Sequence, residues 1–474
     1  MIANNLPPAT APQVSAAIFK AYDVRGIVGT ALTEEAVSAI GLVLGARARA
    51  AGIASVVIGR DGRLSGQALA DALAAGLCAA GVDVIDVGMV PTPVVYFATV
   101  LTGSGTGVAV TGSHNPPEYN GLKMMLGGST LHGDDIRDIA ATLADPARYA
   151  ALFASRPGTR SFRDVVPDYI ARITGDVKLA RPLKVVVDAG NGVAGAVAPA
   201  LLRALGIAEL TELYCEVDGH FPNHHPDPAH PENLRDLARM VAETGADIGL
   251  AFDGDGDRLG VVTPSGQMIF PDRQLMLYAE SVLAGQPGAT IIYDIKCTRN
   301  LAPWIRQRGG QPLMWRTGHS LVKAKMKETG AALAGEMSGH IFFNDRWYGF
   351  DDGLYTAARL LEILARHPAP GALLEGLPDA PATPELQIQV GEGENHALIE
   401  ALQQQARFEG ATEVITIDGL RVEYPDGFGL VRASNTTPVL VLRFEADTPE
   451  ALARIKQQFR AAVLGIRGDV QVPF

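Results

Sequence analysis

Cysteine is scarce in this chain, and no stretch of it is strongly basic. The 474 residues include three cysteines, Cys78, Cys215 and Cys297, which lie far apart. An odd number at such spacing excludes a disulfide framework and a CxxC metal site, and it fits a reducing compartment. The formal charge is −12, from 40 basic against 52 acidic residues, and no run of lysine and arginine exceeds two. We therefore expect no nucleic-acid partner.

A long unbroken hydrophobic run and a signal peptide are also missing. The longest uncharged stretch, residues 87–117 with His114 counted as neutral, is interrupted by Pro91, Pro93, Gly103, Gly105 and Gly107. This pattern predicts two buried strands and a loop rather than a bilayer span. The first residues lack a basic start and an apolar core. We therefore expect a cytoplasmic protein with no membrane partner.

What the chain does contain is ample apolar material and a repeated pattern. Hydrophobic residues make up 47% and charged residues 19%, which excludes a disordered chain, and the length alone predicts about three domains. Three short β-branched runs, at residues 56–58, 185–187 and 291–293, each enter a polar, turn-prone segment. After an Ala/Leu-rich stretch, a second strand pattern and polar loop follow each run. The second patterns are residues 107–110, 248–251 and 331–334.

This alternation predicts an α/β fold of three similar units, with mixed, largely parallel sheets between helices and functional loops at strand ends. The remaining C-terminal part begins after prolines at 378, 381 and 384. It shows a hairpin pattern around Asp418-Gly419, a second strand pair and an amphipathic stretch over 449–464. We expect a smaller α+β domain there. The predicted domains are residues 1–158, 159–267, 268–379 and 380–474.

Three aspartates alternate with glycine after a predicted strand, as Asp253, Asp255 and Asp257. The glycines let the backbone curl so that the three carboxylates point at one centre, which suits Mg²⁺ or a similar hard cation. A calcium EF-hand is excluded, because it requires Gly where Arg258 stands and Glu where Pro264 stands. A solvated acidic turn is the alternative, and the position at a strand end favours the metal site.

Two further loops carry groups suited to phosphate chemistry. Ser113, in Thr-Gly-Ser-His-Asn-Pro-Pro, fits either a nucleophile or phosphoryl carrier or an ordinary turn serine, and Lys123 could add positive charge. The segment from Arg432 to Thr437 combines a guanidinium, an amide and three hydroxyls. It fits a phosphate cradle and a Ser/Thr-rich hairpin turn equally well.

Histidines gather in two kinds of segment. A proline-rich segment holds His220, His224, His225 and His230, but the spacing matches no standard metal site, so a structural loop is favoured. His319 and His340 lie in Gly-rich loops of the third unit and are the better catalytic candidates.

Together these loops resemble the α-D-phosphohexomutase superfamily, most closely its bacterial phosphomannomutase/phosphoglucomutase group. The matching motifs are Phe-Lys-Ala-Tyr-Asp-Val-Arg-Gly from residue 19, Thr-Gly-Ser-His-Asn-Pro from 111, Asp-Gly-Asp-Gly-Asp-Arg from 253, Gly-Glu-Met-Ser-Gly-His from 335 and Arg-Ala-Ser-Asn-Thr-Thr-Pro from 432. They occur in the order of that family and cover almost the whole chain. The resemblance implies four domains around a central cleft, the first three sharing one topology.

The resemblance also assigns residues to roles. It implies a phosphoserine at Ser113, with Mg²⁺ held beside it by Ser113 and the three aspartates. Sugar hydroxyls would be contacted by Glu336 and Ser338. The non-reacting phosphate would be held by Arg432, Ser434, Asn435 and Thr436. The other residues expected to line the cleft are Tyr22, Arg25, Lys123, Arg258, Lys296, His319 and His340.

The activity implied by the resemblance is a reversible transfer of phosphate between C1 and C6 of glucose and mannose phosphates. Its substrates would be hexose 1- and 6-phosphates, and glucose or mannose 1,6-bisphosphate would serve as intermediate and activator. His340 or Lys123 would act as the base and Arg25 as an electrostatic aid. Two alternatives stay open, a phosphoglucosamine mutase and a non-catalytic sugar-phosphate binding protein. Met337 argues against the first, because the amino-sugar branch usually carries Gln there, and the intact Ser113 loop argues against the second.

Overall fold

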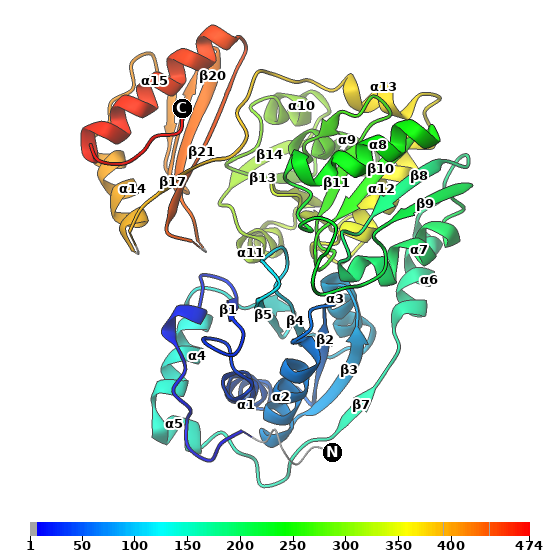
Figure 1. Ribbon diagram of the computed structural model, residues 1–474, viewed down its shortest axis with the longest axis vertical. Helices are drawn as coiled ribbons and strands as arrows, with labels where there is room; N and C mark the ends of the chain where they lie inside the picture. The colour runs from blue at the N-terminus through cyan, green and yellow to red at the C-terminus, as the bar shows by residue number, and fades with distance from the viewer. Residues whose placement is uncertain (1–6, 392, 436) are drawn as a thin grey trace.

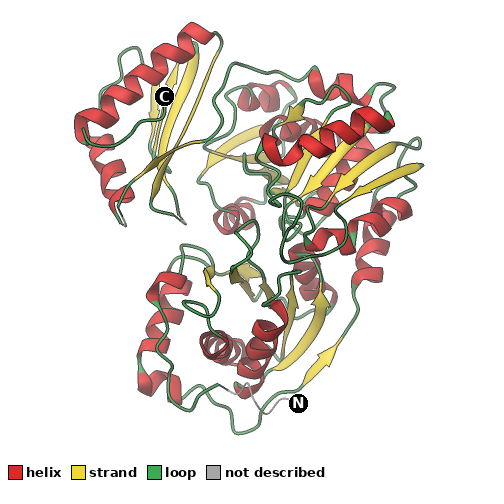
Figure 2. Cartoon of the chain, viewed as in Figure 1, coloured by secondary structure: helices red, strands yellow, loops and turns green. Residues whose placement is uncertain are grey.

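The computed structural model describes residues 7–391, 393–435 and 437–474, and the strands within these ranges form four sheets. The sheets follow one another along the chain, from the N-terminal unit (blue to cyan in Figure 1) to the C-terminal unit (orange and red), with helices against their faces (Figure 2). Across the described ranges, no helix is both long and apolar enough to span a bilayer.

The N-terminal unit contains a sheet with the strand order β1-β5-β4-β2-β3-β7, and β6 pairs with β5. Its elements are β1 (Val24–Ile27), α1 (Glu34–Ala50), β2 (Ser55–Arg60), α2 (Gly66–Ala79), β3 (Asp83–Met89), α3 (Thr92–Leu101), β4 (Gly107–Val110), β5 (Tyr119–Leu126), β6 (Ser129–Thr130), α4 (Asp134–Ala144), α5 (Pro146–Ala150) and β7 (Arg160–Phe162). Because β7 pairs with β3, this sheet continues past the boundary predicted after residue 158. The three boundaries between the four predicted domains stay predictions.

The second unit has the order β12-β11-β10-β8-β9 and the third β14-β13-β15-β16. The second contains α6 (Val166–Asp176), β8 (Lys184–Asp188), α7 (Ala198–Ala204), β9 (Glu209–Leu213), α8 (Arg235–Thr244), β10 (Ile248–Phe252), β11 (Leu259–Val262) and β12 (Met268–Ile269). The third contains α9 (Pro271–Gly285), β13 (Thr290–Asp294), α10 (Leu301–Gln307), β14 (Gln311–Trp315), α11 (His319–Thr329), β15 (Leu333–Gly335), β16 (Ile341–Phe343), α12 (Gly353–Leu364) and α13 (Pro370–Glu375).

The same four-strand block occurs in all three units, which confirms the predicted repeat. The blocks are β5-β4-β2-β3, β11-β10-β8-β9 and β16-β15-β13-β14. In each block three neighbouring strands are parallel, and the strand at one end pairs antiparallel. The carboxyl ends of the two central strands therefore present their loops at the same edge of each sheet.

Local sequence explains how the helices form and pack. The Thr33 hydroxyl accepts a hydrogen bond from the amide of Ala36 and caps α1, whose first turn is acidic and whose last turn is basic. Helix α1 lies close against α2 because glycines face the contact. A Cβ on Gly76 would stand 2.0 Å from the carbonyl oxygen of Ser38.

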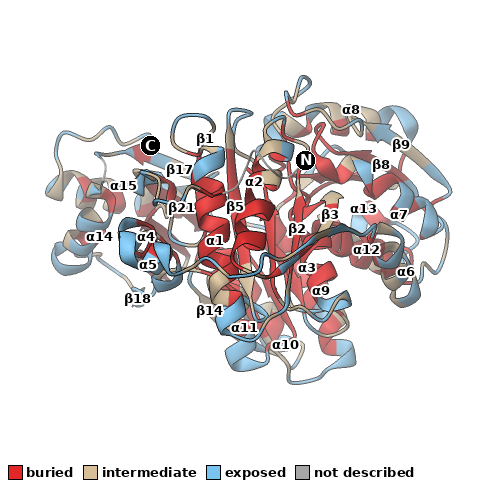
Figure 3. Ribbon diagram, turned by 90° about the horizontal axis from the view of Figure 1, so that it is seen from below, coloured by how far each residue is buried: buried red, intermediate tan, exposed pale blue. Residues whose placement is uncertain are grey.

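One hydrophobic core runs through the first three units, while the N-terminal sheet also has a separate core on its other side. Helix α3 joins the shared core, where Phe97 stacks on Trp347 of the third unit with ring centroids 6.0 Å apart. The sequence prediction for residues 87–117 was wrong here, because α3 lies between the two strands. Figure 3 shows the buried residues concentrated along the sheets and α1.

The C-terminal unit is different, because its sheet β17-β21-β20-β19-β18 is antiparallel throughout. Its elements are β17 (Leu386–Gln389), α14 (Glu394–Gln405), β18 (Glu413–Ile415), β19 (Leu420–Tyr424), β20 (Gly427–Ala433), β21 (Val439–Ala446) and α15 (Pro449–Ile466). Helices α14 and α15 pack on the sheet around a separate core. The predicted class, three α/β units and a smaller α+β domain, is confirmed.

Candidate functional site

Ser113 lies in the loop after β4, and its hydroxyl points from the first unit to the second. Its Oγ is 3.3 Å from Oδ2 of Asp253 and 3.2 Å from Nδ1 of His114. The residue is 3% exposed and has a φ of +49°, in the left-handed region that non-glycine residues rarely adopt. Such a conformation persists only where the surroundings fix it, so this loop is held in one defined shape.

The three aspartates occupy the turn between β10 and β11 and are fully buried. One carboxylate oxygen from each lies within 4.8 Å of the others. Oδ1 of Asp255 and Oδ1 of Asp257 are buried without a hydrogen-bond partner among the described residues. Oxygen ligands that converge in this way, with unsatisfied atoms, fit a hard divalent cation. The group can therefore bind a metal, with the Ser113 hydroxyl at its side.

The electrostatics of this loop reflect three carboxylates crowded into a small volume. Burial, together with the charges of Asp257 and Asp255, raises the pKa of Asp253 to about 7, although Arg258 opposes the rise. Lys123 Nζ, which is buried, donates to Asp255 at 2.8 Å and to Asp257 at 2.5 Å. Burial alone would lower the pKa of Lys123, but the two carboxylates outweigh it and raise that pKa well above its usual value. Lys123 is therefore a fixed positive charge.

Two arginines lie among these loops, and one of them, Arg258, links the second unit to the third. Arg258 donates from Nε to Asp253 at 3.0 Å, and its Nη1 lies 3.3 Å from the carbonyl oxygen of Ser338. Arg25, from β1, donates to the side chain of Asn115 in the Ser113 loop at 2.5 Å. The two guanidinium groups thus bring positive charge to the serine loop, the metal loop and the loop after β15.

The predicted sugar-binding residues follow β15 and contact each other. Glu336 accepts a hydrogen bond from the Ser338 hydroxyl at 3.1 Å and another from the amide of Gly318 at 2.6 Å. Burial raises the pKa of the Glu336 carboxyl. The second hydrogen bond fixes Glu336 next to the start of α11, which carries His319.

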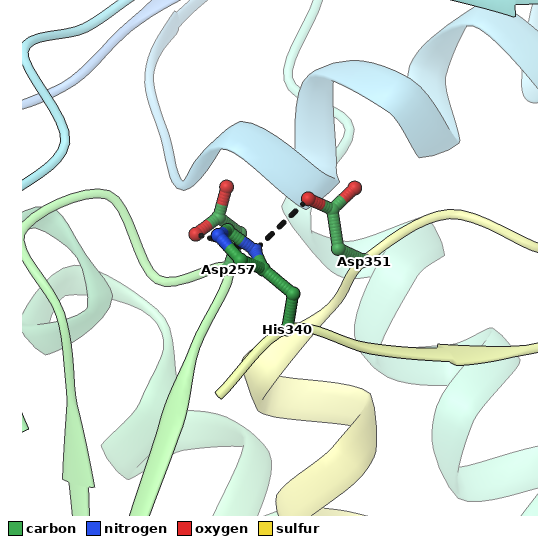
Figure 4. Close-up of side chains that lie close together, drawn as sticks. All are labelled: Asp257, His340 and Asp351. Atoms are coloured by element: carbon green, nitrogen blue, oxygen red, sulfur yellow. Dashed lines mark ion pairs between the residues drawn. The ribbon is translucent and has the colours of Figure 1, made fainter. Parts of the chain in front are cut away.

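His340 lies between two carboxylates, as Figure 4 shows. Its Nδ1 is 3.1 Å from Asp351 Oδ2 and 3.5 Å from Asp257 Oδ1. Burial opposes protonation, but these carboxylates outweigh it and raise the pKa of His340. The ring of His319 stacks on that of His340 and meets the edge of Tyr22 in the first unit. The two predicted histidines are therefore brought together beside the metal loop.

Sequence reasoning missed several residues of this site. Asp351 pairs with His340 and, through its other oxygen, with Lys323 at 2.8 Å. Thr92, at the start of α3, donates its hydroxyl to Asp255 at 2.6 Å. For Asp351 the sequence carried a signal, because two aspartates stand together at 351–352 directly before a helix. Nothing local identifies Thr92, because its partner is 163 residues away.

The predicted phosphate loop joins β20 to β21. Arg432, which is buried, donates to Asp418 at 3.1 Å and 3.3 Å. Burial raises the pKa of Tyr22, in the first unit, to about 12, and the charge of Arg432 opposes that rise. Ser434 Oγ lies 3.0 Å from Oγ1 of Thr437, and Asn435 is half-buried. Thr436 lies outside the described residues.

The structure places Lys296 and the histidines of the proline-rich segment outside the cluster of Ser113 and the three aspartates. Lys296 contacts Glu385 of the C-terminal unit, with Nζ 2.5 Å from the carboxylate. In the proline-rich segment, His224 pairs with Asp188 at 3.0 Å. In the described part of the chain, none of the four histidines of this segment belongs to a group of three potential metal ligands. This agrees with the structural role favoured for that segment.

Comparisons with known proteins match these units in order. Models of the phosphoglucomutase/phosphomannomutase α/β/α domains I, II and III match residues 16–149, 167–266 and 270–379, and that of the C-terminal domain matches residues 385–462. A Neisseria gonorrhoeae protein named phosphoglucomutase is 57% identical over 94% of this chain and 96% of its own length. A Pseudomonas aeruginosa protein named phosphomannomutase/phosphoglucomutase is 53% identical over 98% and 99%.

A solved structure agrees with both relatives. The crystal structure of a phosphoglucomutase/phosphomannomutase family protein from Burkholderia thailandensis superimposes with a TM-score of 0.92 at 60% identity, covering 98% of this chain and 100% of that one. Four domain matches and relatives this similar over nearly their full length leave one conclusion. The chain belongs to the phosphoglucomutase/phosphomannomutase family of the α-D-phosphohexomutase superfamily.

Proposed function

We propose that this chain is a phosphohexomutase, an isomerase that moves a phosphoryl group reversibly between C1 and C6 of glucose and mannose phosphates. One observation carries the proposal. The hydroxyl of Ser113 lies against Asp253, in the group of three aspartates that also holds Lys123. The names of the relatives, phosphoglucomutase and phosphomannomutase/phosphoglucomutase, support the choice of sugars.

The reaction consists of two phosphoryl transfers, one from Ser113 to the sugar and one from the sugar to Ser113. Phosphorylated Ser113 gives its phosphoryl group to the free hydroxyl of a hexose monophosphate, so that the P–O bond to Ser113 breaks and one to the sugar forms. The hydroxyl proton passes to a base, and a hexose 1,6-bisphosphate results. The bisphosphate rotates in the site, its other phosphoryl group passes to the oxygen of Ser113, and the base gives its proton to the sugar oxygen that this transfer releases. The product is the isomeric monophosphate, and the phosphoserine is restored.

The charges around Ser113 suit this transfer. Mg²⁺, held by Ser113, Asp253, Asp255 and Asp257, would neutralise negative charge on the transferring group. Lys123 and Arg25 supply fixed positive charge from the first unit, and Arg258 supplies it from the second. These groups are held in place by hydrogen bonds before substrate binds, so they need little rearrangement during the reaction.

His340 is the better of the two proposed bases. The raised pKa of Lys123 leaves its ammonium protonated, with both carboxylates in place to keep it so. An imidazole whose Nδ1 faces Asp351 can accept a proton at its other nitrogen and be stabilised as the cation. His319 stacks on this ring and packs against Tyr22, so it holds the base in position.

Substrate binding divides between two units. Arg432, Ser434, Asn435 and Thr436 would hold the phosphate that does not react, and Lys296 would flank them. Because the bisphosphate turns over, this loop must accept either end of the sugar. Glu336 and Ser338 would read O3 and O4, which glucose and mannose present alike. A galactose phosphate misplaces O4, and a site built around that hydroxyl can discriminate by about 10⁴–10⁵-fold.

Assays on glucose, mannose, galactose and glucosamine 1-phosphates, with Mg²⁺ and a trace of glucose 1,6-bisphosphate, test the proposal. We expect comparable catalytic efficiency on glucose and mannose 1-phosphates and little turnover of the other two. Preferred turnover of glucosamine 1-phosphate would show a phosphoglucosamine mutase. Tight binding of hexose phosphates without any turnover would show a binding protein.

A further inference from the structure

One carboxylate recurs at the same place in each of the three α/β units. Asp61 follows β2 directly, while Asp188 and Asp294 are the last residues of β8 and β13. They are 3%, 0% and 0% exposed. The proposed reaction gives these residues no role, although each ends a β-branched strand that marks the sequence repeat.

The sheet register relates each aspartate to a functional loop. Asp188 pairs with Ala251 in the sheet. In the other two units the last pairs are Arg60–Val110 and Tyr293–Gly335, and extending the register by one residue places Asp61 opposite Thr111 and Asp294 opposite Glu336. When the register is extended in this way, a functional residue lies in every unit two positions beyond the residue opposite the aspartate, and in the third unit the opposite residue, Glu336, is itself a predicted site residue. The opposed pairs are Asp61 and Thr111, Asp188 and Ala251, and Asp294 and Glu336, and the functional residues are Ser113, Asp253 and Ser338.

In the first unit the carboxylate binds the serine loop directly. Oδ2 of Asp61 accepts hydrogen bonds from the Thr111 hydroxyl at 2.8 Å and from the amide of Gly112 at 3.1 Å. The Thr111 hydroxyl oxygen in turn accepts the amide of Ser113 at 2.8 Å. Asp61 thus fixes the two residues that precede Ser113.

Asp61 also holds a buried arginine against the same loop. The Arg63 side chain and amide donate to Asp61 at 3.2 Å and 3.0 Å. The guanidinium also donates to four carbonyl oxygens, two of them those of Ser113 at 2.9 Å and Asn115 at 2.5 Å. The other two belong to Pro116 and Tyr119. The positive φ of Ser113 is therefore enforced from both sides of the loop.

In the third unit the equivalent carboxylate joins two loops. Oδ1 of Asp294 accepts the amide of Met337 at 3.2 Å, between Glu336 and Ser338. Oδ2 accepts the hydroxyl of Thr317 at 2.9 Å. One buried side chain thus fixes the predicted sugar-binding loop relative to the loop that leads into α11 and His319.

In the second unit the carboxylate acts through the proline-rich segment. Asp188 accepts the amide of Gly190 at 2.8 Å and pairs with His224 at 3.0 Å. Two residues further on, the carbonyl oxygen of Pro226 accepts the amide of Gly254 in the metal loop at 3.1 Å. The segment around His224 therefore supports the metal loop through a backbone hydrogen bond, a role that the sequence alone did not indicate.

We propose that Asp61, Asp188 and Asp294 are equivalent positioning residues, each of which holds one functional loop in the geometry the reaction requires. The task of each loop rests on the proposed function, whereas the anchoring itself does not. Asp61, Asp188 and Asp294 contact no reacting group, so each acts through the loop it holds. Their loss should affect phosphoryl transfer, metal binding and sugar binding separately.

Asparagine is the sharpest replacement, because it keeps the size of the side chain and changes one acceptor into a donor. Each carboxylate oxygen of Asp61 accepts from at least one N–H group, which cannot act as an acceptor, so an amide NH₂ at either place faces a donor. The hydroxyl of Thr317 beside Asp294 can instead rotate and accept from an amide. We therefore expect Asp61→Asn to cost more than Asp294→Asn.

The experiment compares Asp61→Asn, Asp188→Asn and Asp294→Asn with the control Asp83→Asn. Asp83 accepts the amide and hydroxyl of Thr159 at 2.7 Å and 2.8 Å, and it lies at the amino end of β3, the edge of the sheet away from these loops. Amide hydrogen exchange followed by mass spectrometry should show faster exchange only in peptides around residues 106–118, 248–260 and 331–343, respectively. The control should leave all three peptides unchanged.

Steady-state kinetics should separate the three variants. Asp61→Asn should lower kcat by about 10²-fold with little change in KM, because a misplaced serine slows transfer itself. Asp188→Asn should raise the Mg²⁺ concentration needed for half-maximal activity. Asp294→Asn should mainly raise KM for hexose 1-phosphate, by roughly tenfold.

Two results would overturn the positioning role. One is unchanged exchange in the matching peptide. The other is equal acceleration in all peptides, which would mark a general loss of stability. If the wild-type protein shows no mutase activity, the proposed function fails, but hydrogen exchange still decides whether the aspartates hold these loops.

Discussion

The two ends of the candidate site are built in opposite ways. The Ser113 and metal loops belong to units that share one continuous hydrophobic core. The Arg432 loop belongs to a C-terminal unit whose core is separate. Between the C-terminal unit and the third unit lies a small apolar cluster around Ile295, and hydrogen bonds and ion pairs join the two units elsewhere.

The polar contacts are specific and buried. Arg421 donates to the carbonyl oxygens of Ile295 and Cys297 at 2.6 Å and 2.8 Å, and Arg443 pairs with Asp272 at 3.3 Å. Contacts of this kind between domains break and form again in shifted positions more readily than a packed apolar core. The serine and metal loops thus sit on units joined by one apolar core, whereas the proposed phosphate loop sits on a unit with its own core, and we expect that unit to adjust more readily.

The strongest test of the serine and metal loops is Ser113→Ala. It should lower turnover by about 10³-fold or more, because the covalent route is lost while the neighbouring charges remain. Mass spectrometry should find phosphate on Ser113 in the wild-type protein. Ser161→Ala, at an exposed position in β7, is the control and should keep full activity. Near-normal turnover of Ser113→Ala would exclude the phosphoserine route.

Asp255→Asn should have the next largest effect, a fall in kcat on the order of 10²–10³-fold. The amide is a weaker ligand for a hard cation, so excess Mg²⁺ should restore part of the rate. Titration of activity and of bound Mg²⁺ in parallel checks this, with circular dichroism as the control for folding. Loss of the folded spectrum would instead show that the loop serves stability.

Arg432→Ala tests the proposed phosphate loop. Loss of a charged hydrogen bond to phosphate costs about 1.5–3 kcal/mol, which should raise KM for hexose 1-phosphate by roughly 10–150-fold. Some bisphosphate should also leave before the second transfer, and chromatography would detect it. Arg432→Lys keeps the charge without the paired geometry, so its KM should be intermediate. An unchanged KM for the alanine variant would place the phosphate pocket elsewhere.

The smallest effect on catalysis should come from Phe459→Ala, which tests the separation of the cores. Phe459 is buried in the C-terminal core and contacts Phe408 and Phe444. Its loss should destabilise that unit by about 3–5 kcal/mol and leave activity near normal below its melting temperature. Calorimetry should show one early transition and one unchanged. Phe343→Ala, in the shared core, should shift the other transition. A single shifted transition in both variants would show one cooperative body.

Sequence could predict groups whose chemistry and position are both local. The Asp-Gly repeat at 253–257 and the small-residue loop around Ser113 are both recognisable in the sequence at the ends of predicted strands. The three-unit architecture follows from the alternation of strand and helix patterns. Asp351 and Thr92 could not be predicted, because their partners come from distant elements. Helix α3 was missed because its Val, Tyr and Phe residues suit a strand, although Pro91 and Pro93 at its start are typical of a helix N-terminus.

The packing of α3 also bears on how the protein is made. Phe97 is covered by Tyr169 of the second unit and Trp347 of the third, with ring centroids 5.4 Å and 6.0 Å apart. During synthesis this apolar face has left the ribosome long before residue 347 is added. At about 5–20 residues per second, the roughly 250 intervening residues take on the order of 10–50 seconds. The part of Phe97 that Trp347 covers therefore lacks its apolar partner throughout that interval, so the shared core is completed only after the third unit has been made.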